Sequence, residues 1–254
     1  MDNSSISDAL SKLNEDVSVE LASTSAALQE AYSLRYQVYC RERAFLSGQN
    51  SIETDEFDHH SRHALIRWRR TGEAIGTVRL VLPLGDDAEE DFPMEHVCDP
   101  DVLTGFPRAG TGEVSRFALS KQATAMVREA SPETAALLRL ALLQGALWMS
   151  AEAGHSHWLA VMQPTLLRLL RSDGLQFQPL GPLVDYHGRR QPVLAHLGTM
   201  LSGVAREQPA VWRYLTRGGA VFSGRPAPNL ELPAAALLAQ TNRRGTLSRF
   251  ASMT

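Results

Sequence analysis

The apolar positions of this chain follow two periods, and the changes between them predict the order of its elements. Short alternating or continuous apolar runs predict strands, and apolar residues spaced three or four positions apart predict helices. The expected strands cover residues 17–21, 63–68, 75–82, 113–119, 157–162, 176–180 and 192–197. The expected helices cover residues 26–43, 134–149 and 164–170, with a last helix after the final strand.

The longest apolar segment, residues 134–149, predicts a helix with a well-marked start. Ser131 suits the N-cap and Pro132 suits the first helical position. Arg139 and Gln144 interrupt the apolar run, which is shorter than a bilayer span. We therefore expect a core helix and no membrane span.

This element order predicts one α+β domain with a mixed, mostly antiparallel sheet and helices on both faces. Its expected limits are residues 17–217, after a polar N-terminal segment at 1–16. The last two strands should pair around the turn at 186–189. Residues 218–254 are rich in Pro, Gly, Ala and Arg without periodicity, so we expect a loosely structured tail.

Composition narrows the class of protein. A chain of 254 residues with 44% hydrophobic content can bury a full-sized core. The net charge of −3 gives no general reason to expect a nucleic-acid partner. Cys40 and Cys98 lack the spacing of a metal or redox site. The acidic N-terminal segment is unlike a signal peptide, so we expect a cytoplasmic location.

The strand at 113–119, EVSRFAL, carries two opposite charges in an apolar run. Burying a charge is costly unless the charge is paired, so the strand contains an internal salt bridge or builds a site. Alternation places Glu113, Ser115 and Phe117 on one face and Arg116 on the other. All four can share one site only if the strand contains a bulge.

An ordered set of motifs runs through residues 30–120. It comprises R-x2-V-Y from Arg35, D-E-F-D at 55–58, G-T-V-R-L at 76–80, Phe92 and E-V-S-R-F at 113–117. This set resembles the acyl-homoserine-lactone synthases. The phrases RYQVYCRER, ETDEFDHHSRH and GTVRLVLP are more similar to N-acyl amino acid synthases and to exosortase-associated acyltransferases.

The resemblance implies the GCN5-related N-acetyltransferase (GNAT) fold, in which the fourth and fifth strands splay apart and admit the pantetheine arm of an acyl carrier. Those strands would be 113–119 and 157–162 here. The implied activity is transfer of a long-chain acyl group from an acyl-CoA or acyl carrier protein thioester to the amine of an amino-acid-like small molecule, without a permanently bound cofactor. The alternatives are a catalytically silent acyl-carrier or lipid-binding module of the same fold and a true acyl-homoserine-lactone synthase.

Two departures from the resembling families bear on these alternatives. Phe45 stands where the lactone synthases have a Trp, so lactone formation is not assumed. The glycine-rich phosphate loop of acetyl-CoA enzymes is absent between Leu119 and Ser131. Backbone amides in that stretch remain candidates for binding pyrophosphate.

Attack of an amine on a thioester requires a proton acceptor and donors for the developing oxyanion. Glu113 is the candidate base, because burial raises the pKa of a carboxyl; the alternative is an ion pair with Arg116 or Arg79. Ser115 and Arg116 complete the expected catalytic set. The resemblance places Arg35, Asp55, Asp58, Arg79, Phe92 and Phe117 at substrate-binding positions. For Arg79 the alternative is a structural clamp on the loop at 45–60.

Metal and partner sites receive weaker support. The histidine-rich run at 58–63 lacks a second cluster, so no metal site is expected. Basic pairs are candidate contacts for an acidic acyl carrier protein, although such pairs are commonly just solvated. These pairs are Arg69 with Arg70, Arg168 with Arg171, and Arg189 with Arg190.

Overall fold

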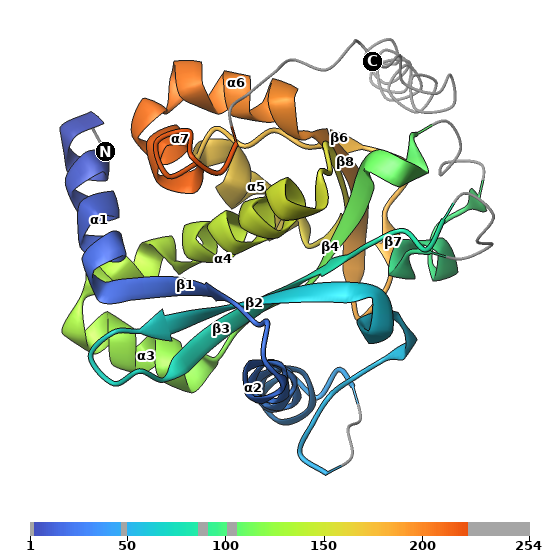
Figure 1. Cartoon of the computed structure of the whole chain (residues 1–254), viewed down its shortest axis with the longest axis horizontal. Helices are drawn as coiled ribbons and strands as arrows, with labels where there is room; N and C mark the ends of the chain where they lie inside the picture. Colours follow the sequence, from blue (N-terminus) through green and yellow to red (C-terminus); the bar gives the residue numbers. More distant parts are fainter. Residues whose placement is uncertain (1–2, 47–49, 86–90, 101–105, 223–254) are drawn as a thin grey trace, which may run out of the picture.

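The computed structural model describes residues 3–46, 50–85, 91–100 and 106–222, and these residues build one eight-stranded sheet (Figure 1). The strand order is β1-β2-β3-β4-β5-β8-β6, and β7 pairs with β8. Adjacent strands are antiparallel except for β4 and β5. The expected α+β class with a mixed, mostly antiparallel sheet is confirmed. The strands are β1 Val17–Leu21, β2 Ser61–Trp68, β3 Ala74–Val81, β4 Thr111–Leu119, β5 His157–Met162, β6 Gln178–Pro179, β7 Val184–Asp185 and β8 Arg189–His196.

Helices cover both faces of the sheet, as expected. α4 lies along one face together with α1, α5, α6 and α7, and α2 covers the opposite face (Figure 1). The helices are α1 Asn3–Asp16, α2 Ser25–Arg35, α3 Lys121–Ala130, α4 Pro132–Ala153, α5 Pro164–Ser172, α6 Leu197–Glu207 and α7 Pro209–Leu215. Shorter helical turns are the π-helix η1 Tyr36–Glu42 and the 3-10 turns η2 Glu56–His60, η3 Pro93–His96 and η5 Arg108–Gly110.

The sheet separates apolar clusters that lie on its two faces. Leu80 of β3 belongs to the large cluster on the α4 face, and its neighbour Val81 belongs to a smaller cluster on the α2 face. In β5 the same alternation puts Ala160 in the large cluster and Leu159 in the small one. This alternation is the expected pattern for a sheet that is buried on both faces.

α4 is the core helix that the sequence predicts. By length and composition it meets the criteria for a membrane span, yet 72% of its most apolar stretch is buried inside the protein. A Cβ atom added at Gly145 would come within 2.8 Å of the Ala64 side chain. Glycine at this position therefore allows α4 to lie close against β2.

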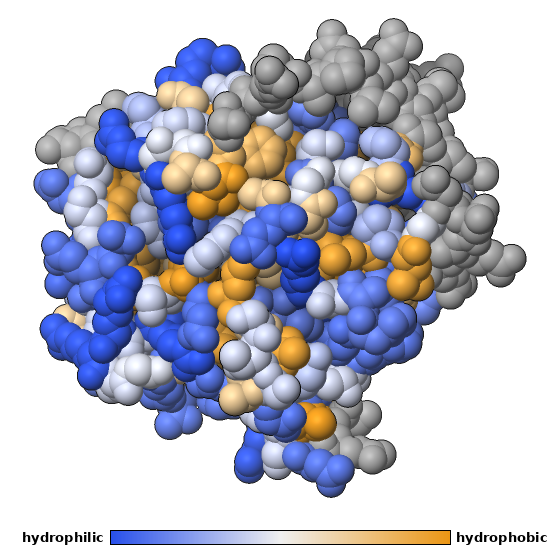
Figure 2. All heavy atoms as spheres, in the orientation of Figure 1, coloured by the Kyte–Doolittle hydropathy of each residue, from blue (hydrophilic) through white to orange (hydrophobic). Residues whose placement is uncertain are grey.

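The surface in the view of Figure 2 is mainly hydrophilic. Apolar residues are scattered between polar ones on this face. Among the described residues, the large hydrophobic side chains that remain exposed are Leu84 and Leu169, at 54% and 50% of their surface. Leu169 lies on α5 beside the site described below.

Some elements differ from those expected. Residues 3–16 of the polar N-terminal segment form α1, whose Leu10 and Leu13 are buried in the large cluster. The stretch at 121–130, for which no element was predicted, forms α3. The turn at 186–188 joins β8 to the short strand β7, and the expected strand at 176–180 shortens to the two residues of β6. Residues 223–254 of the predicted tail lie outside the described residues.

Candidate active site

The sheet opens between β4 and β5. These parallel strands pair only where Thr111 to Glu113 face His157 to Leu159. Beyond that point a cavity of about 450 Å³ lies between the strands, lined by residues 113–117 of β4 and by residues 161–163 at and just beyond the end of β5. The open sheet expected between these two strands is confirmed.

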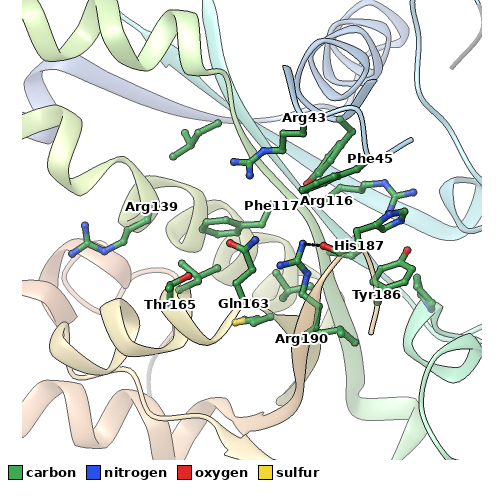
Figure 3. Close-up of a pocket in the computed structure, with 18 of the residues that line it drawn as sticks. Arg43, Phe45, Arg116, Phe117, Arg139, Gln163, Thr165, Tyr186, His187 and Arg190 are labelled. Carbon is green, nitrogen blue, oxygen red and sulfur yellow. Dashed lines mark hydrogen bonds between the residues drawn. The ribbon is translucent and has the colours of Figure 1, made fainter. Parts of the chain in front are cut away.

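The cavity is bordered by apolar side chains from both faces of the sheet. Met94, Val97 and Val161 belong to the cluster on the α2 face. On the α4 face, the cavity is lined by Phe117, Leu119, Ala135, Leu166 and Leu170. Figure 3 shows Arg139 and Thr165 on one side of the cavity and Arg43, Phe45 and His187 on the other. The cavity therefore reaches both faces through the gap between the strands.

A bulge in β4 redirects Arg116. Thr77 pairs with Ala118 and Arg79 pairs with Ser115, so β4 contains one more residue than β3 over this interval. Arg116 has a φ of 48°, a left-handed conformation that is uncommon for residues other than glycine. The bulge that the sequence required for Glu113 and Arg116 to share one site is confirmed.

Three arginines and three carboxylates form a closed ring on the α2 face. Each arginine bridges two carboxylates, and each carboxylate accepts hydrogen bonds from two arginines. In order around this charge ring, the members are Arg35, Asp58, Arg79, Asp55, Arg116 and Glu53. The ring joins α2, β3 and β4 to the segment at 53–58.

The contacts within the charge ring are short and directional. Arg35 donates from Nε to Glu53 at 2.5 Å and from Nη1 and Nη2 to Asp58 at 2.6 and 3.0 Å. Arg116 donates from Nη2 to Asp55 Oδ2 at 2.7 Å, and Arg79 donates to Asp55 as well. Charge-assisted contacts of this kind are among the stronger hydrogen bonds in proteins.

Burial explains why the charge ring has to be complete. The Arg35 and Arg79 side chains are 0% exposed, and an unpaired charge there would be strongly destabilising. Burial alone would raise the pKa of Asp58, but the hydrogen bonds and charge of Arg35, the charge of Arg79 and the Asp55 amide together outweigh it and hold that pKa below its ordinary value. The pKa of Glu53 is lowered in the same way, against burial, by Arg35 and Arg116. Both carboxyls are therefore ionised at neutral pH.

The charge ring contains four residues that the sequence predicted at substrate-binding positions: Arg35, Asp55, Asp58 and Arg79. Arg35 is fully buried and does not lie on a helix surface, and Asp55 and Asp58 are held by arginines. The clamp expected of Arg79 is present; contact of these residues with a substrate remains a prediction. Glu53 was missed. Its signal in the sequence is its position two residues before Asp55, which places another carboxylate in the same short segment.

Glu113 stands apart from the charge ring. Its side chain is 2% exposed, and its Oε2 accepts a hydrogen bond from the Met94 amide at 2.8 Å. The alternative of an ion pair with Arg79 or Arg116 is wrong, because both arginines donate to the acids of the ring. Burial raises the pKa of Glu113 to about 7, even though the Met94 amide acts in the opposite direction. A carboxyl with this pKa is a usable base near neutral pH.

The turn that carries Met94 is fixed by its own polar network. Glu95 Oε2 accepts hydrogen bonds from the amides of Asp91 and Phe92. The Arg108 guanidinium donates hydrogen bonds to the carboxylates of Asp91 and Glu95. Phe92 is fully buried in the cluster on the α2 face and is not among the residues that line the cavity. The expected substrate contact for Phe92 is therefore not observed, since this turn directs the ring into the core.

The remaining predicted residues border the cavity. Ser115 lines it and its Oγ accepts a hydrogen bond from Arg79 Nε at 2.9 Å. Phe117 and Phe45 line it as well. Tyr39, the last residue of the R-x2-V-Y motif, was not assigned a role; it also lines the cavity and lies under the Arg116 guanidinium, 5.7 Å from its ring centre.

The backbone amides after β4 were candidates for binding pyrophosphate, but two of them already have partners within the protein. The Lys121 amide at the start of α3 donates to Glu42 Oε2 at 2.8 Å, and the Ala123 amide donates to Ser120 Oγ. A carboxylate thus occupies the positive end of this helix. Within the described parts of the chain, no group of three or more His, Cys, Asp or Glu residues is placed to hold a metal ion.

Comparisons with known proteins agree with this geometry. Residues 34–126 match the family model of the acetyltransferase (GNAT) domain. Among solved structures, the CoA-dependent acyl-homoserine lactone synthase MesI is similar at 20% identity, covering 84% of this chain and 98% of its own, with a TM-score of 0.56. TofI, whose structure was solved in a ternary complex with an inhibitor and MTA, is similar at 22% identity, covering 77% of this chain and 99% of its own, with a TM-score of 0.55.

A third structure is FeeM, an N-acyl amino acid synthase from uncultured soil microbes. Its identity is 15%, its coverage is 76% of this chain and 96% of its own, and its TM-score is 0.51. No curated protein sequence matches the chain. Residues 34–126 therefore match a GNAT acetyltransferase domain, and the fold of the described residues is that of acyl-homoserine-lactone synthase structures such as MesI.

Proposed function

We propose that this protein is an N-acyltransferase that moves a long-chain acyl group from an acyl-CoA or acyl carrier protein thioester to the amine of an amino-acid-like small molecule. The observation that carries the proposal is Glu113, a buried carboxyl with a pKa of about 7, at the point where β4 and β5 separate beside the cavity. The GNAT domain and the likeness to MesI and FeeM support it.

The two ends of the cavity suit the two substrates. The apolar end on the α4 face, with Phe117, Leu119 and Leu166, suits an acyl chain. Glu113 borders the cavity beside Met94 of the α2 face, so the amine approaches from that face. The thioester carbon then lies in the gap between the strands.

In the proposed reaction the amine nitrogen attacks the thioester carbon. Glu113 accepts the proton that the amine loses, the new C–N bond forms, and the C–S bond breaks to release a thiol that takes up a proton. Backbone amides of β4 beyond Glu113 lack β5 as a hydrogen-bonding partner. These amides are our candidates for stabilising the oxyanion.

An acyl carrier protein is one proposed donor. Leu169 is exposed and lines the cavity, and it lies between Arg168 and the nearby Arg171, both exposed on α5. An apolar residue flanked by cations at a cavity mouth suits an acidic carrier. A bacterial origin and kinship with exosortase-associated acyltransferases belong to the same proposal and rest on the sequence resemblance. The proposed cytoplasmic location rests on the composition of the N-terminal segment. Lactone formation is not included, because Phe45 replaces the Trp of the lactone synthases.

The test is consumption of acyl thioesters with and without an amine. Purified protein is mixed with palmitoyl-CoA, palmitoyl carrier protein or acetyl-CoA, and with a mixture of amino acids; free thiol and product masses are then measured. We expect thiol release that depends on the amine, with a higher kcat/KM for the long-chain donors than for acetyl-CoA. Binding of the long-chain thioester without release of thiol would instead indicate a silent acyl-binding module.

A further inference from the structure

One backbone amide contacts the carboxylate of Glu113. The neighbours of Glu113 on the adjacent strands are Val81 of β3 and Leu159 of β5, and both belong to the apolar cluster on the α2 face. Within the described part of the chain, the Met94 amide is the single hydrogen-bond donor to this carboxylate. The position of Met94 therefore influences how tightly Glu113 holds a proton.

Met94 belongs to η3, a turn of four residues that carboxylates hold in place. Glu95 Oε2 accepts hydrogen bonds from the Asp91 and Phe92 amides at 2.7 and 2.8 Å, which fixes the start of the turn. The Asp91 side chain is fully buried, and its Oδ1 accepts a hydrogen bond from the Leu84 amide at 2.9 Å. Two carboxylates thus bind the backbone that leads into η3.

Arg108 joins these carboxylates to the strand that carries Glu113. Its Nη1 donates to Asp91 Oδ2 at 2.9 Å, and its Nη2 donates to Glu95 Oε1. Arg108 lies in η5, the turn directly before β4. The guanidinium therefore closes a loop of contacts that runs from β4 through η5 to η3, and from η3 back to Glu113 on β4.

Arg108 also affects the charges around Glu113. The titratable and charged groups that act on Glu113 come from the elements packed around it: Arg79 on β3, Arg116 on β4, Glu95 on η3 and Cys98 just after η3. Burial raises the pKa of Glu113 to about 7; the Met94 amide and the two arginines act against burial, and Glu95 acts with it. The Cys98 thiol stays neutral at pH 7, because burial raises its pKa to about 11. Arg108 neutralises Glu95, so loss of Arg108 would favour the protonated form of Glu113.

We propose that Arg108 is a positioning residue for the reaction, which holds η3 against the start of β4 and so keeps the Met94 amide on the Glu113 carboxylate. This inference rests on the proposed function, because it concerns the base of that reaction. Arg108 is not among the described residues that line the cavity, so its effect passes through η3. Arg43 and Arg190, by contrast, line the cavity, where a substrate can contact them directly.

The test is the pH profile of kcat/KM for amine-dependent thiol release in Arg108→Gln. This change releases the Met94 amide and leaves the charge of Glu95 unneutralised, and both effects favour the protonated form of Glu113. We expect the midpoint of the profile to rise by roughly one to two pH units, the size of one lost hydrogen bond to a charged group. Activity at pH 7 should fall roughly 5- to 50-fold, and activity on the alkaline plateau should change little. Arg108→Lys, which keeps the charge without the fork, should show a smaller shift.

The matched control is Arg67→Gln. Arg67 also bridges two acids, Glu20 and Glu30, and its side chain is 20% exposed, compared with 28% for Arg108. It lies on β2 and is not among the described residues that line the cavity. Melting temperatures measure the stability lost in both variants, and the midpoint of the Arg67→Gln profile should stay at that of the unmodified protein. A shift in Arg67→Gln as large as that in Arg108→Gln would overturn the inference.

A second measurement requires no activity. Carbon-13 NMR of labelled glutamate follows the carboxyl of Glu113 in the substrate-free protein, and the signal is assigned by its loss in Glu113→Gln. Its titration should move to higher pH in Arg108→Gln, and by a smaller interval in Arg108→Lys, which carries the test if Arg108→Gln does not fold. An unmoved titration in either folded variant would overturn the inference. A moved titration without thiol release from any amine would support the positioning of Glu113 and count against the proposed function.

Discussion

At the scale of single residues, the site contains buried carboxyls in two opposite electrostatic states. Glu53 and Asp58 are buried with arginines on their oxygens, so their pKa values fall. Glu113 is buried with one backbone amide, so its pKa rises to about 7. The difference lies in the partners of each carboxyl, and it separates groups that stabilise the fold from a group that can exchange a proton.

The raised pKa of Glu113 predicts a pH-dependent loss of stability. Its folded pKa of about 7 exceeds its ordinary value of 4.5, so between these values the folded state binds more protons and stability falls as pH rises. From pH 4 to pH 8, the free energy of unfolding should fall by roughly 3 kcal/mol more than that of Glu113→Gln. Urea denaturation of both proteins across this range measures the difference. Parallel pH profiles would contradict the raised pKa.

The charge ring predicts a large cost for removing one cation. Arg116→Ala leaves Glu53 and Asp55 each without one of their arginine partners, and it should lower the free energy of unfolding by roughly 3 to 5 kcal/mol. The control is Arg62→Ala, which breaks an exposed pair with Glu152 and should change stability by less than about 1 kcal/mol. Chemical denaturation at pH 7 compares the two. Equal effects would mean that the ring is not a stabilising unit.

Acidification should weaken the same ring. The pKa values of Glu53 and Asp58 are lowered in the folded state, so their contribution is present above their ordinary values of 4.5 and 3.8 and is lost as pH falls below them. The excess cost of Arg116→Ala over Arg62→Ala should therefore shrink below about pH 4.

Sequence patterns revealed part of this residue-level picture. The charges in EVSRFAL required either a bulge or separate sites, and the bulge at Arg116 is present. Glu53 and Arg43 were not singled out as site residues, and Arg190 was named only as half of a basic pair, because no strand or helix period specifies their partners. Their neighbours come from distant parts of the chain, and only the folded structure brings these parts together.

At the scale of elements, short local patterns predicted strands better than helices. β1 and β5 have the predicted limits, because β1 alternates apolar and polar residues and β5 is a short, largely apolar run. α1 was missed, since only a few apolar residues at helical spacing, Leu10 and Leu13 among them, interrupt its polar sequence. α3 was missed because the stretch between Leu119 and Ser131 was compared only with the glycine-rich phosphate loop, which it lacks, and not with a helix.

The π-helix η1 brings its neighbours to the cavity. It extends α2 from Tyr36 to Glu42, and π-helical turns are rare and often occur at functional sites. Tyr39 of this turn and Arg43 at its end line the cavity, and Glu42 occupies the start of α3. One irregular helical segment thus links the candidate acceptor end of the cavity to the end of β4.

Two glycines provide a test of how α4 sits on the sheet. Gly145→Ala should lower stability by roughly 1 to 3 kcal/mol, because its Cβ would crowd Ala64. Gly203→Ala in α6 meets no atom within 4 Å and should raise stability by about 1 kcal/mol through helix propensity alone. Thermal or urea denaturation measures both variants. A stabilising Gly145→Ala would contradict the close approach of α4 to β2.

At the scale of the whole molecule, the gap between β4 and β5 connects the two faces of the sheet. In the proposed reaction, the acyl donor and the acceptor enter from opposite faces and meet at Glu113. The open sheet was expected from the resemblance to the GNAT fold. The carboxylate at the start of α3 was not expected, because Glu42 lies 79 positions before Lys121 in the sequence.

The most direct test of this account is the pH dependence of kcat/KM for amine-dependent thiol release in the unmodified protein and in Glu113→Gln. The account predicts that kcat/KM of the unmodified protein rises through a pKa near 7. Glu113→Gln should remain folded, lose this rise, and be slower by roughly a hundredfold to ten-thousandfold at pH 8, as is typical for loss of a general base. A Glu113→Gln protein with near-normal turnover and an unchanged pH profile would contradict the account.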